Sequence, residues 1–166
     1  MLALTISKVR PFMAALLTKD SFDSFLLREG SVTTFCTYTI DGTYQSAFFN
    51  DDETPEEGAV PPYASWAQLR PHVFDMIKGS RTPLAFRLVF HFPKSLCLAL
   101  TERSGYRTNA DNLNAFFLNL RFKDNLILLT TGSSQTVFPP DRELDRIWDT
   151  YIRSFLTGNG LEFEEE

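Results

Sequence analysis

Strict alternation of side-chain type over residues 84–92 is the strongest constraint on the fold of this chain. Apolar residues occupy the even positions, Leu84, Phe86, Leu88, Phe90 and Phe92, and Ala85, Arg87, Val89 and His91 stand between them. Because successive side chains of a strand point to opposite faces, this pattern predicts a strand with one apolar face. Residues 116–122 alternate in the same way. We therefore expect a sheet with one face on a core and the other at least partly open.

The remaining periodicities predict further strands and helices. We expect strands over residues 2–6, 25–29, 32–40, 43–49, 126–131 and 136–138, and helices over 9–17, 66–78, 95–104 and from 141 to 158. Asp41-Gly42 is a type I′ hairpin signal, and Pro71 predicts that the regular helix around it begins near Arg70. These elements predict an α+β fold, an antiparallel sheet with helices packed mainly on one face.

Sixteen phenylalanines in 166 residues indicate a core built largely from aromatic side chains. A chain of this length buries enough surface to fold as one domain, 1–166, without a metal or disulfide staple. Cys36 and Cys97 lack metal-ligand spacing, and we interpret them as two small core thiols in a reducing cytoplasm. A disulfide or a catalytic thiol is the alternative.

Residues 1–79 and 84–158 follow the same predicted order of elements. The only two tryptophans, Trp66 and Trp148, and the turn residues Asp41 and Asp124 recur at nearly the same offset. This predicts a tandem β-α-β-β-β-α duplication, clamp-like or TATA-binding-protein-like by fold analogy only. The alternative is that two ordinary α+β segments have a similar order and spacing of elements by chance. Residues 159–166 are predicted to be an acidic, solubilising tail.

Charge is unevenly distributed along the chain. Residues 1–67 carry four basic and nine acidic residues, 68–123 carry nine basic and three acidic, and 124–166 carry three basic and nine acidic. The overall net charge of −5 argues against bulk non-specific nucleic-acid binding. The basic middle third leaves room for a local anion site.

Standard catalytic and metal motifs are absent from the sequence. Residues 131–134 lack the glycine spacing and the lysine of a phosphate-binding P-loop, and we find no nucleophile elbow or zinc motif. The acidic residues Asp51, Asp52, Glu53, Glu56 and Glu57 do not have the spacing of a calcium loop. We interpret them as a solvated loop and expect no metal and no cofactor.

The strand pattern brings together a small set of candidate anion-binding residues. Arg87, His91, Asn119 and Arg121 project from the face opposite the apolar rows. If their strands are neighbours, they form a basic patch suited to a phosphate or carboxylate. The competing interpretation is the ordinary polar face of an antiparallel sheet. Lys78 and Arg81 form a second basic group, which extends the site only if it packs near Arg87.

Several segments resemble an uncharacterised family. They are Trp66-Ala-Gln-Leu-Arg-Pro71, Ile77-Lys-Gly-Ser-Arg-Thr-Pro-Leu84, Phe117-Leu-Asn-Leu-Arg121, Thr131-Gly-Ser-Ser134, and Asp141 to Asp149 with Trp148-Asp149. This sequence is similar over nearly its whole length to a domain-of-unknown-function family of small proteins from anaerobic Gram-positive bacteria. The resemblance implies a cytoplasmic bacterial protein with no established activity, and it assigns no catalytic residues.

Three functional classes fit these observations. The first is a non-enzymatic binding or interaction module, which uses the open sheet face or the groove between halves for an anionic small molecule, a nucleic acid or a protein. The second is an enzyme in which Arg87 and Arg121 hold an anionic substrate and His91, in a deep pocket, is the general acid or base. The third is a homodimer formed through a sheet edge or the open face. With no run of eighteen apolar residues and no signal-peptide pattern, we expect a cytoplasmic protein.

Overall fold

In the part of the chain that the structure describes, seven strands pair in one antiparallel sheet with the order β3-β2-β4-β5-β6-β1-β7. The computed structural model describes residues 1–50, 52–53, 60–107, 109 and 111–166. The strands are β1 (Ala3–Ile6), β2 (Leu26–Thr33), β3 (Thr37–Asp41), β4 (Ala85–His91), β5 (Leu113–Lys123), β6 (Leu126–Gln135) and β7 (Phe163–Glu165). The helices are α1 (Val9–Leu17), α2 (Trp66–Ile77), α3 (Lys94–Arg103) and α4 (Arg142–Gly158), with a short 3-10 helix η1 (Ser46–Phe48). The predicted α+β class is confirmed.

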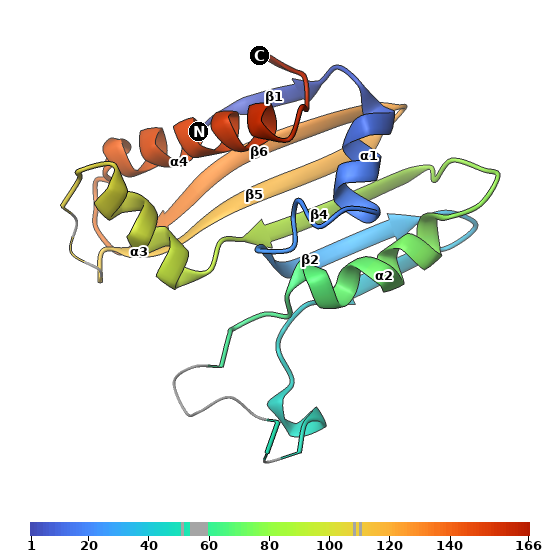
Figure 1. Ribbon diagram of the computed structural model, residues 1–166, viewed down its shortest axis with the longest axis horizontal. Helices are drawn as coiled ribbons and strands as arrows, with labels where there is room; N and C mark the ends of the chain where they lie inside the picture. The colour runs from blue at the N-terminus through green and yellow to red at the C-terminus, as the bar shows by residue number, and fades with distance from the viewer. Residues whose placement is uncertain (51, 54–59, 108, 110) are drawn as a thin grey trace.

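The four helices lie on one side of the sheet (Figure 1). The alternation along β4 explains this arrangement, because Phe86, Leu88 and Phe90 are almost fully buried while Arg87 is exposed and His91 is half-buried. The apolar row faces the helices, and the other row lies on the open face of the sheet. None of the helices in the described part of the chain is long and apolar enough to cross a membrane.

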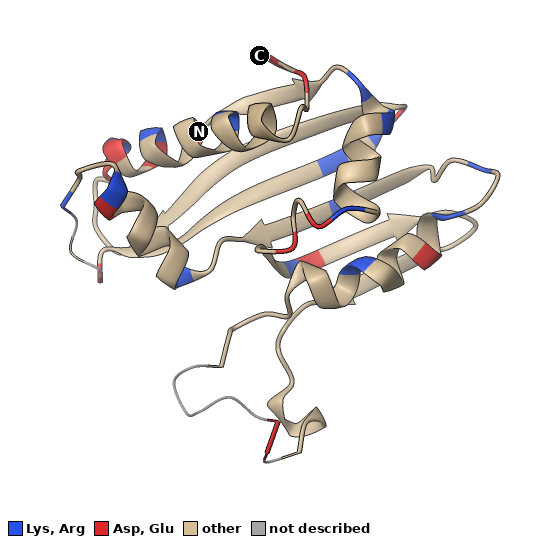
Figure 2. Cartoon of the chain, viewed as in Figure 1, with Lys and Arg blue, Asp and Glu red and all other residues tan. Residues whose placement is uncertain are grey.

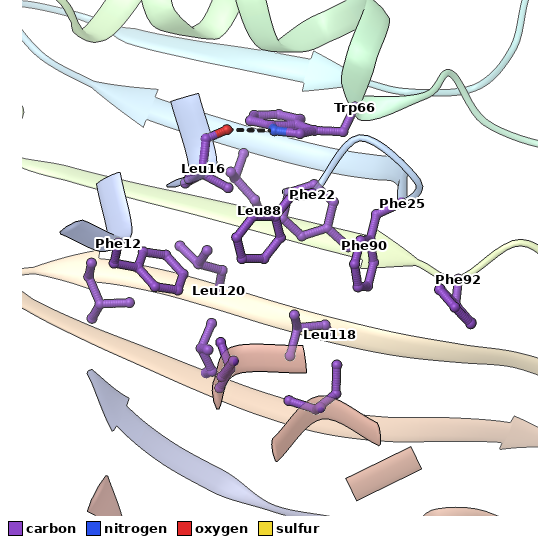
Figure 3. Packing of buried hydrophobic residues seen from close by; sticks show 14 of the residues in the cluster. Phe12, Leu16, Phe22, Phe25, Trp66, Leu88, Phe90, Phe92, Leu118 and Leu120 are labelled. Atoms are coloured by element: carbon purple, nitrogen blue, oxygen red, sulfur yellow. Dashed lines mark hydrogen bonds between the residues drawn. The ribbon is translucent and has the colours of Figure 1, made fainter. Parts of the chain in front are cut away.

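Aromatic rings form the centre of the core, as the phenylalanine content predicts. Phe22 and Phe25, in the segment between α1 and β2, pack against Phe90 with ring centroids 6.1 and 5.7 Å away. Trp66 lies edge-on to Phe90 and donates its indole N–H to the carbonyl of Leu16 over 2.8 Å (Figure 3). A buried tryptophan thus keeps its one donor satisfied.

The first hairpin differs from the prediction. β2 runs unbroken from Leu26 to Thr33 and returns as β3, so Asp41-Gly42 ends a strand and does not turn a hairpin. The predicted strand 43–49 is wrong, because Asp41 accepts hydrogen bonds from the amide and hydroxyl of Thr43 and the chain leaves the sheet. Cys36 lies in the β2–β3 turn and is exposed, which corrects its interpretation as a core thiol; Cys97 in α3 is buried.

The bounds of several helices and strands also differ from the prediction. α2 begins at Trp66 with a Ser65–Gln68 capping box, and Pro71 lies inside it without delaying its start. Leu84 precedes β4 and is exposed, so it does not belong to the buried row. Residues 136–138 form no strand, and Phe138 there is 94% exposed.

The C-terminal segment is part of the sheet and is not the free acidic tail predicted for residues 159–166. β7 pairs with β1 at one edge of the sheet. Arg153 of α4 forms a bidentate ion pair with Glu165, at 2.6 and 3.2 Å. Lys8 pairs with Glu162 at 2.6 Å. These cations hold a glutamate-rich segment against the sheet.

The two predicted halves are interleaved in the sheet. Each follows the order β-α-β-β-α over its described residues, one strand fewer than predicted. β4, β5 and β6 of the second half are neighbours, whereas β1 of the first half pairs with β6 and is separated from β2 by three strands. Asp41 and Asp124 also stand in different settings, a strand end and the β5–β6 turn. The tandem duplication therefore stays a prediction. Of the two residue offsets that suggested it, Asp41–Asp124 no longer supports it and Trp66–Trp148 remains.

Candidate functional site

The pairing of β4 with β5 brings the predicted residues together on the open face. Arg87 lies opposite Arg121, Val89 opposite Asn119, and His91 opposite Phe117. Neighbouring positions in one register share a face of the sheet. The prediction that Arg87, His91, Asn119 and Arg121 share this face is therefore confirmed.

The four residues differ in the ion pairs and hydrogen bonds that they already form. Arg87 forms an exposed ion pair with Glu29, 3.5 Å away. Asn119 is half-buried and donates its amide to the hydroxyl of Thr130 over 3.3 Å. Arg121 is exposed and has no ion pair with any residue that the structure describes. Of the two arginines on this face of β4 and β5, Arg121 therefore has the charge more available to an incoming anion.

His91 lines a groove of about 670 Å³ at the end of the sheet where β4 finishes. Its ring contacts two others, with the Tyr63 centroid at 5.0 Å and an interplanar angle of 75°, and the Phe117 centroid at 6.2 Å and 28°. We call Tyr63, His91 and Phe117 the aromatic shelf. Arg28 and Asn114 add a cation and an amide to the same groove.

Local irregularities build this groove. The β2–β4 register shifts between Leu27 and Glu29, which makes Arg28 the extra residue of a β-bulge. Tyr63 is held by a β-bridge to Thr43. Phe117 lies so close to its neighbour on β6 that a Cβ added at Gly132 would stand 2.4 Å from the ring. Glycine at position 132 therefore allows Phe117 to lie flat against the strand.

The surroundings of His91 favour its neutral form. Partial burial lowers the pKa of His91, and the nearby positive charge of Arg28 lowers it further. A ligand that carries negative charge into the groove would offset the effect of Arg28.

Lys78 and Arg81 belong to a different place in the molecule. They line a separate groove of about 940 Å³ together with Lys8 and Arg10. Lys78 pairs with Asp75 at 2.8 Å, and Lys8 with Glu162. The structure therefore does not join this group to Arg87, which lines neither groove.

The basic middle third does not form one surface. Lysine and arginine are distributed over the sheet, the helices and the loops (Figure 2). Arg70 of this third forms a bidentate pair with Asp23, at 2.8 Å for both bonds. No cluster of three or more metal-ligating side chains occurs in the described part of the chain. Asp51, Glu56 and Glu57 of the acidic loop lie outside the described residues.

Comparison with known proteins identifies the family without assigning a function. Residues 15–164 match the model of a family of unknown function, DUF5721. The chain belongs to this family. No curated protein and no solved structure matches it.

Phe117, Arg28 and Tyr63 line the groove but are not among the site residues that the sequence predicts. Phe117 has the same parity as Asn119 and Arg121, so its alternation could have placed it on the open face. Arg28 reaches the groove only through a β-bulge, and Tyr63 only through a bridge to Thr43. Neither contact has a signal in the local sequence.

Proposed function

We propose that this DUF5721 protein is a non-enzymatic binding module whose ligand carries a flat ring and a negative charge. The observation that carries the proposal is the convergence of the aromatic shelf and Arg28 in one groove of about 670 Å³. Small-molecule sites typically combine such a volume with aromatic walls and a few polar groups.

Each part of the groove has a distinct role in this proposal. The half-buried Phe117 and Tyr63 offer ring surface for stacking. Arg28 is exposed and unpaired among the described residues, and its planar guanidinium suits a carboxylate or phosphate. Asn114, also exposed, supplies an amide that can both donate and accept. The ligand is thus held by stacking at one end and by charge at the other.

An enzyme is the second candidate because His91, with its lowered pKa, lines the groove. A catalytic histidine normally has a nucleophile to activate or a partner that orients it. Among the described residues no carboxylate or thiol lines this groove. Of the hydroxyls that line it, that of Ser133 already donates to Asp145 over 2.6 Å. Binding therefore needs fewer assumptions than catalysis.

The setting that we propose is the cytoplasm of a bacterium. The resemblance to proteins of anaerobic Gram-positive bacteria supports it, and so does the buried, unpaired Cys97 thiol. Intracellular proteins commonly keep such thiols reduced. Fractionation of the native host, with the chain followed by antibody, tests this part of the proposal.

Ligand binding is tested by adding adenosine monophosphate and benzoate to the labelled protein and following amide chemical shifts. We expect shifts clustered at residues 28, 63, 91 and 117. The Arg28→Gln variant is expected to bind roughly tenfold or more weakly, as for a lost charged hydrogen bond.

Arg10→Gln is the matched control, because Arg10 lines the other groove. It removes the same charge and should leave affinity unchanged. Shifts clustered around Arg10 and Arg81, or equal losses in the two variants, would contradict the proposal.

A further inference from the structure

We infer that the open sheet face binds single-stranded nucleic acid, with bases on the aromatic shelf and phosphates along Arg121 and Lys123. This inference rests on the proposed function, since it names the ligand class of the same groove. It extends the site from the groove along β5 toward the β5–β6 turn.

The shelf has the arrangement that base stacking needs. His91 and Phe117 lie opposite each other on β4 and β5 with their ring planes 28° apart, and the Tyr63 ring stands edge-on to His91. All three are half-buried, so they are fixed by packing and still present ring surface. Aromatic rings on an open sheet stack on unpaired bases with little sequence preference, since every base has a flat face.

The cations lie where the backbone of such a strand would continue. Arg121 and Lys123 follow Phe117 at alternate positions of β5, so their side chains share its face, and both are exposed. At about 3.4 Å per residue, Phe117 and Lys123 stand about 20 Å apart. That length suits a few extended nucleotides.

The pairing of Arg87 with Arg121 also favours an anion. Like charges directly opposite on neighbouring strands destabilise a sheet. Glu29 compensates Arg87 through an exposed ion pair at 3.5 Å, but no described carboxylate pairs with Arg121. A phosphate beside Arg121 would remove this repulsion.

Single strands fit this surface better than duplex. Bases in a duplex are stacked on each other, so the shelf would have no free base face to contact. The net charge of −5 also gives the molecule little of the broad positive field that holds duplex DNA. RNA and DNA single strands share the chemistry that the face recognises, and the experiment separates them.

The test is fluorescence polarisation with labelled single strands of about ten nucleotides, as RNA and as DNA, and with the DNA duplex. We expect one or both single strands to bind more tightly than the duplex. For phosphate contacts by Arg121 and Lys123, the logarithm of affinity should fall against the logarithm of salt concentration with a slope of about −1.4.

Two variants and one control localise the binding. Phe117→Leu keeps an apolar side chain but removes the ring, and we expect it to weaken binding roughly tenfold. Arg121→Gln should weaken binding and reduce the salt slope by about 0.7. Arg146→Gln removes the same charge from α4, on the other side of the sheet. It should change neither the affinity nor the salt slope. Thermal unfolding of each variant checks that the fold is kept.

The outcomes distinguish this inference from the proposed function. Binding of adenosine monophosphate with no tighter binding of either single strand overturns the inference and leaves the proposed function standing. Duplex binding as tight as single-strand binding, or variants that bind like the control, also overturn the inference. If adenosine monophosphate, benzoate and both single strands all fail to bind, the inference and the proposed function are both overturned.

Discussion

Gly42 shows how a single residue can be fixed by contact with a neighbouring strand. Its amide donates to the carbonyl of Arg28 over 2.9 Å, and its carbonyl accepts from Ala64 over 2.8 Å. A Cβ at this position would lie 1.7 Å from the carbonyl oxygen of Leu27. Since backbone cannot move aside as a flexible side chain can, the position excludes every side chain.

Gly42→Ala should therefore destabilise the protein by about 3 kcal/mol or more, the upper range for overpacked sites. Chemical denaturation measures the change in unfolding free energy. Gly158→Ala is the matched control, because a Cβ there meets nothing within 4 Å and alanine favours a helix. A loss at Gly42 no larger than at Gly158 would show that the strands can separate at little cost.

His91 is expected to make the stability of the fold depend on pH. The pKa of His91 is lowered by burial and by Arg28, so the unfolded chain binds a proton more readily than the folded one. Stability should then fall as pH drops through the unfolded value of about 6.5. Compared with His91→Gln, the wild-type protein should lose more unfolding free energy between about pH 7 and pH 5.

Nuclear magnetic resonance provides the direct measurement of the His91 effect. Arg28→Gln should raise the pKa of His91 toward its ordinary value, because it removes one of the two causes of the shift. The His91 ring signal is assigned by its absence in His91→Gln. An unchanged titration in Arg28→Gln would place the guanidinium charge too far from the ring to matter.

At the scale of elements, a polar seam docks α4 on β6. Asp149 accepts the hydroxyl of Thr131, Ser133 donates to Asp145, and Gln135 bonds the backbone of Asp141. Thr131 is 1% exposed and also accepts the amide of Leu2 over 2.8 Å. One hydroxyl therefore connects the residue before β1 with β6 and α4.

Thr131→Val is expected to cost about 1–3 kcal/mol, because it leaves the buried amide of Leu2 without its side-chain acceptor and removes the hydroxyl that donates to Asp149. Thr130→Val is the matched control one residue away, on the open face, where the half-buried hydroxyl only accepts from Asn119. It should cost at most about 0.5–1 kcal/mol. Equal unfolding free energies for the two variants would show that the seam adds nothing to stability.

The elements that the sequence predicts well are those with strong local periodicity. Residues 9–17 form α1 as predicted, and the alternating rows become the buried sides of β4 and β5. The prediction fails where contacts between segments distant in the sequence determine the local structure. Asp41-Gly42 has the composition of a turn, but the glycine is required by Leu27. The glutamates of β7 form a strand because β1 and Arg153 hold them there, and Lys8 pairs with Glu162 just before the strand.

At the scale of the whole molecule, the order of strands joins the two halves. β1 has only β6 and β7 as neighbours, and both lie beyond residue 84. β2 pairs with β4 across the same division. The core is shared as well, since Phe22 contacts Phe90 and Phe155 and Phe25 contacts Phe92. Each half therefore completes the sheet and the core of the other.

Separate fragments should show this dependence. Fragment 1–79 alone leaves β1 unpaired and exposes the rings of Phe22 and Phe25, so we expect no cooperative thermal transition. Fragment 84–166 keeps β4, β5 and β6 as neighbours and should retain strand content by circular dichroism, with exposed apolar surface that binds a hydrophobic dye. Mixing the two should restore a cooperative transition and reduce dye binding, because the β1–β6 and β2–β4 pairs reform. A cooperative transition for fragment 1–79 alone would mean that its strands can pair with one another, as in a true tandem repeat, and that the interleaved sheet is not required for folding.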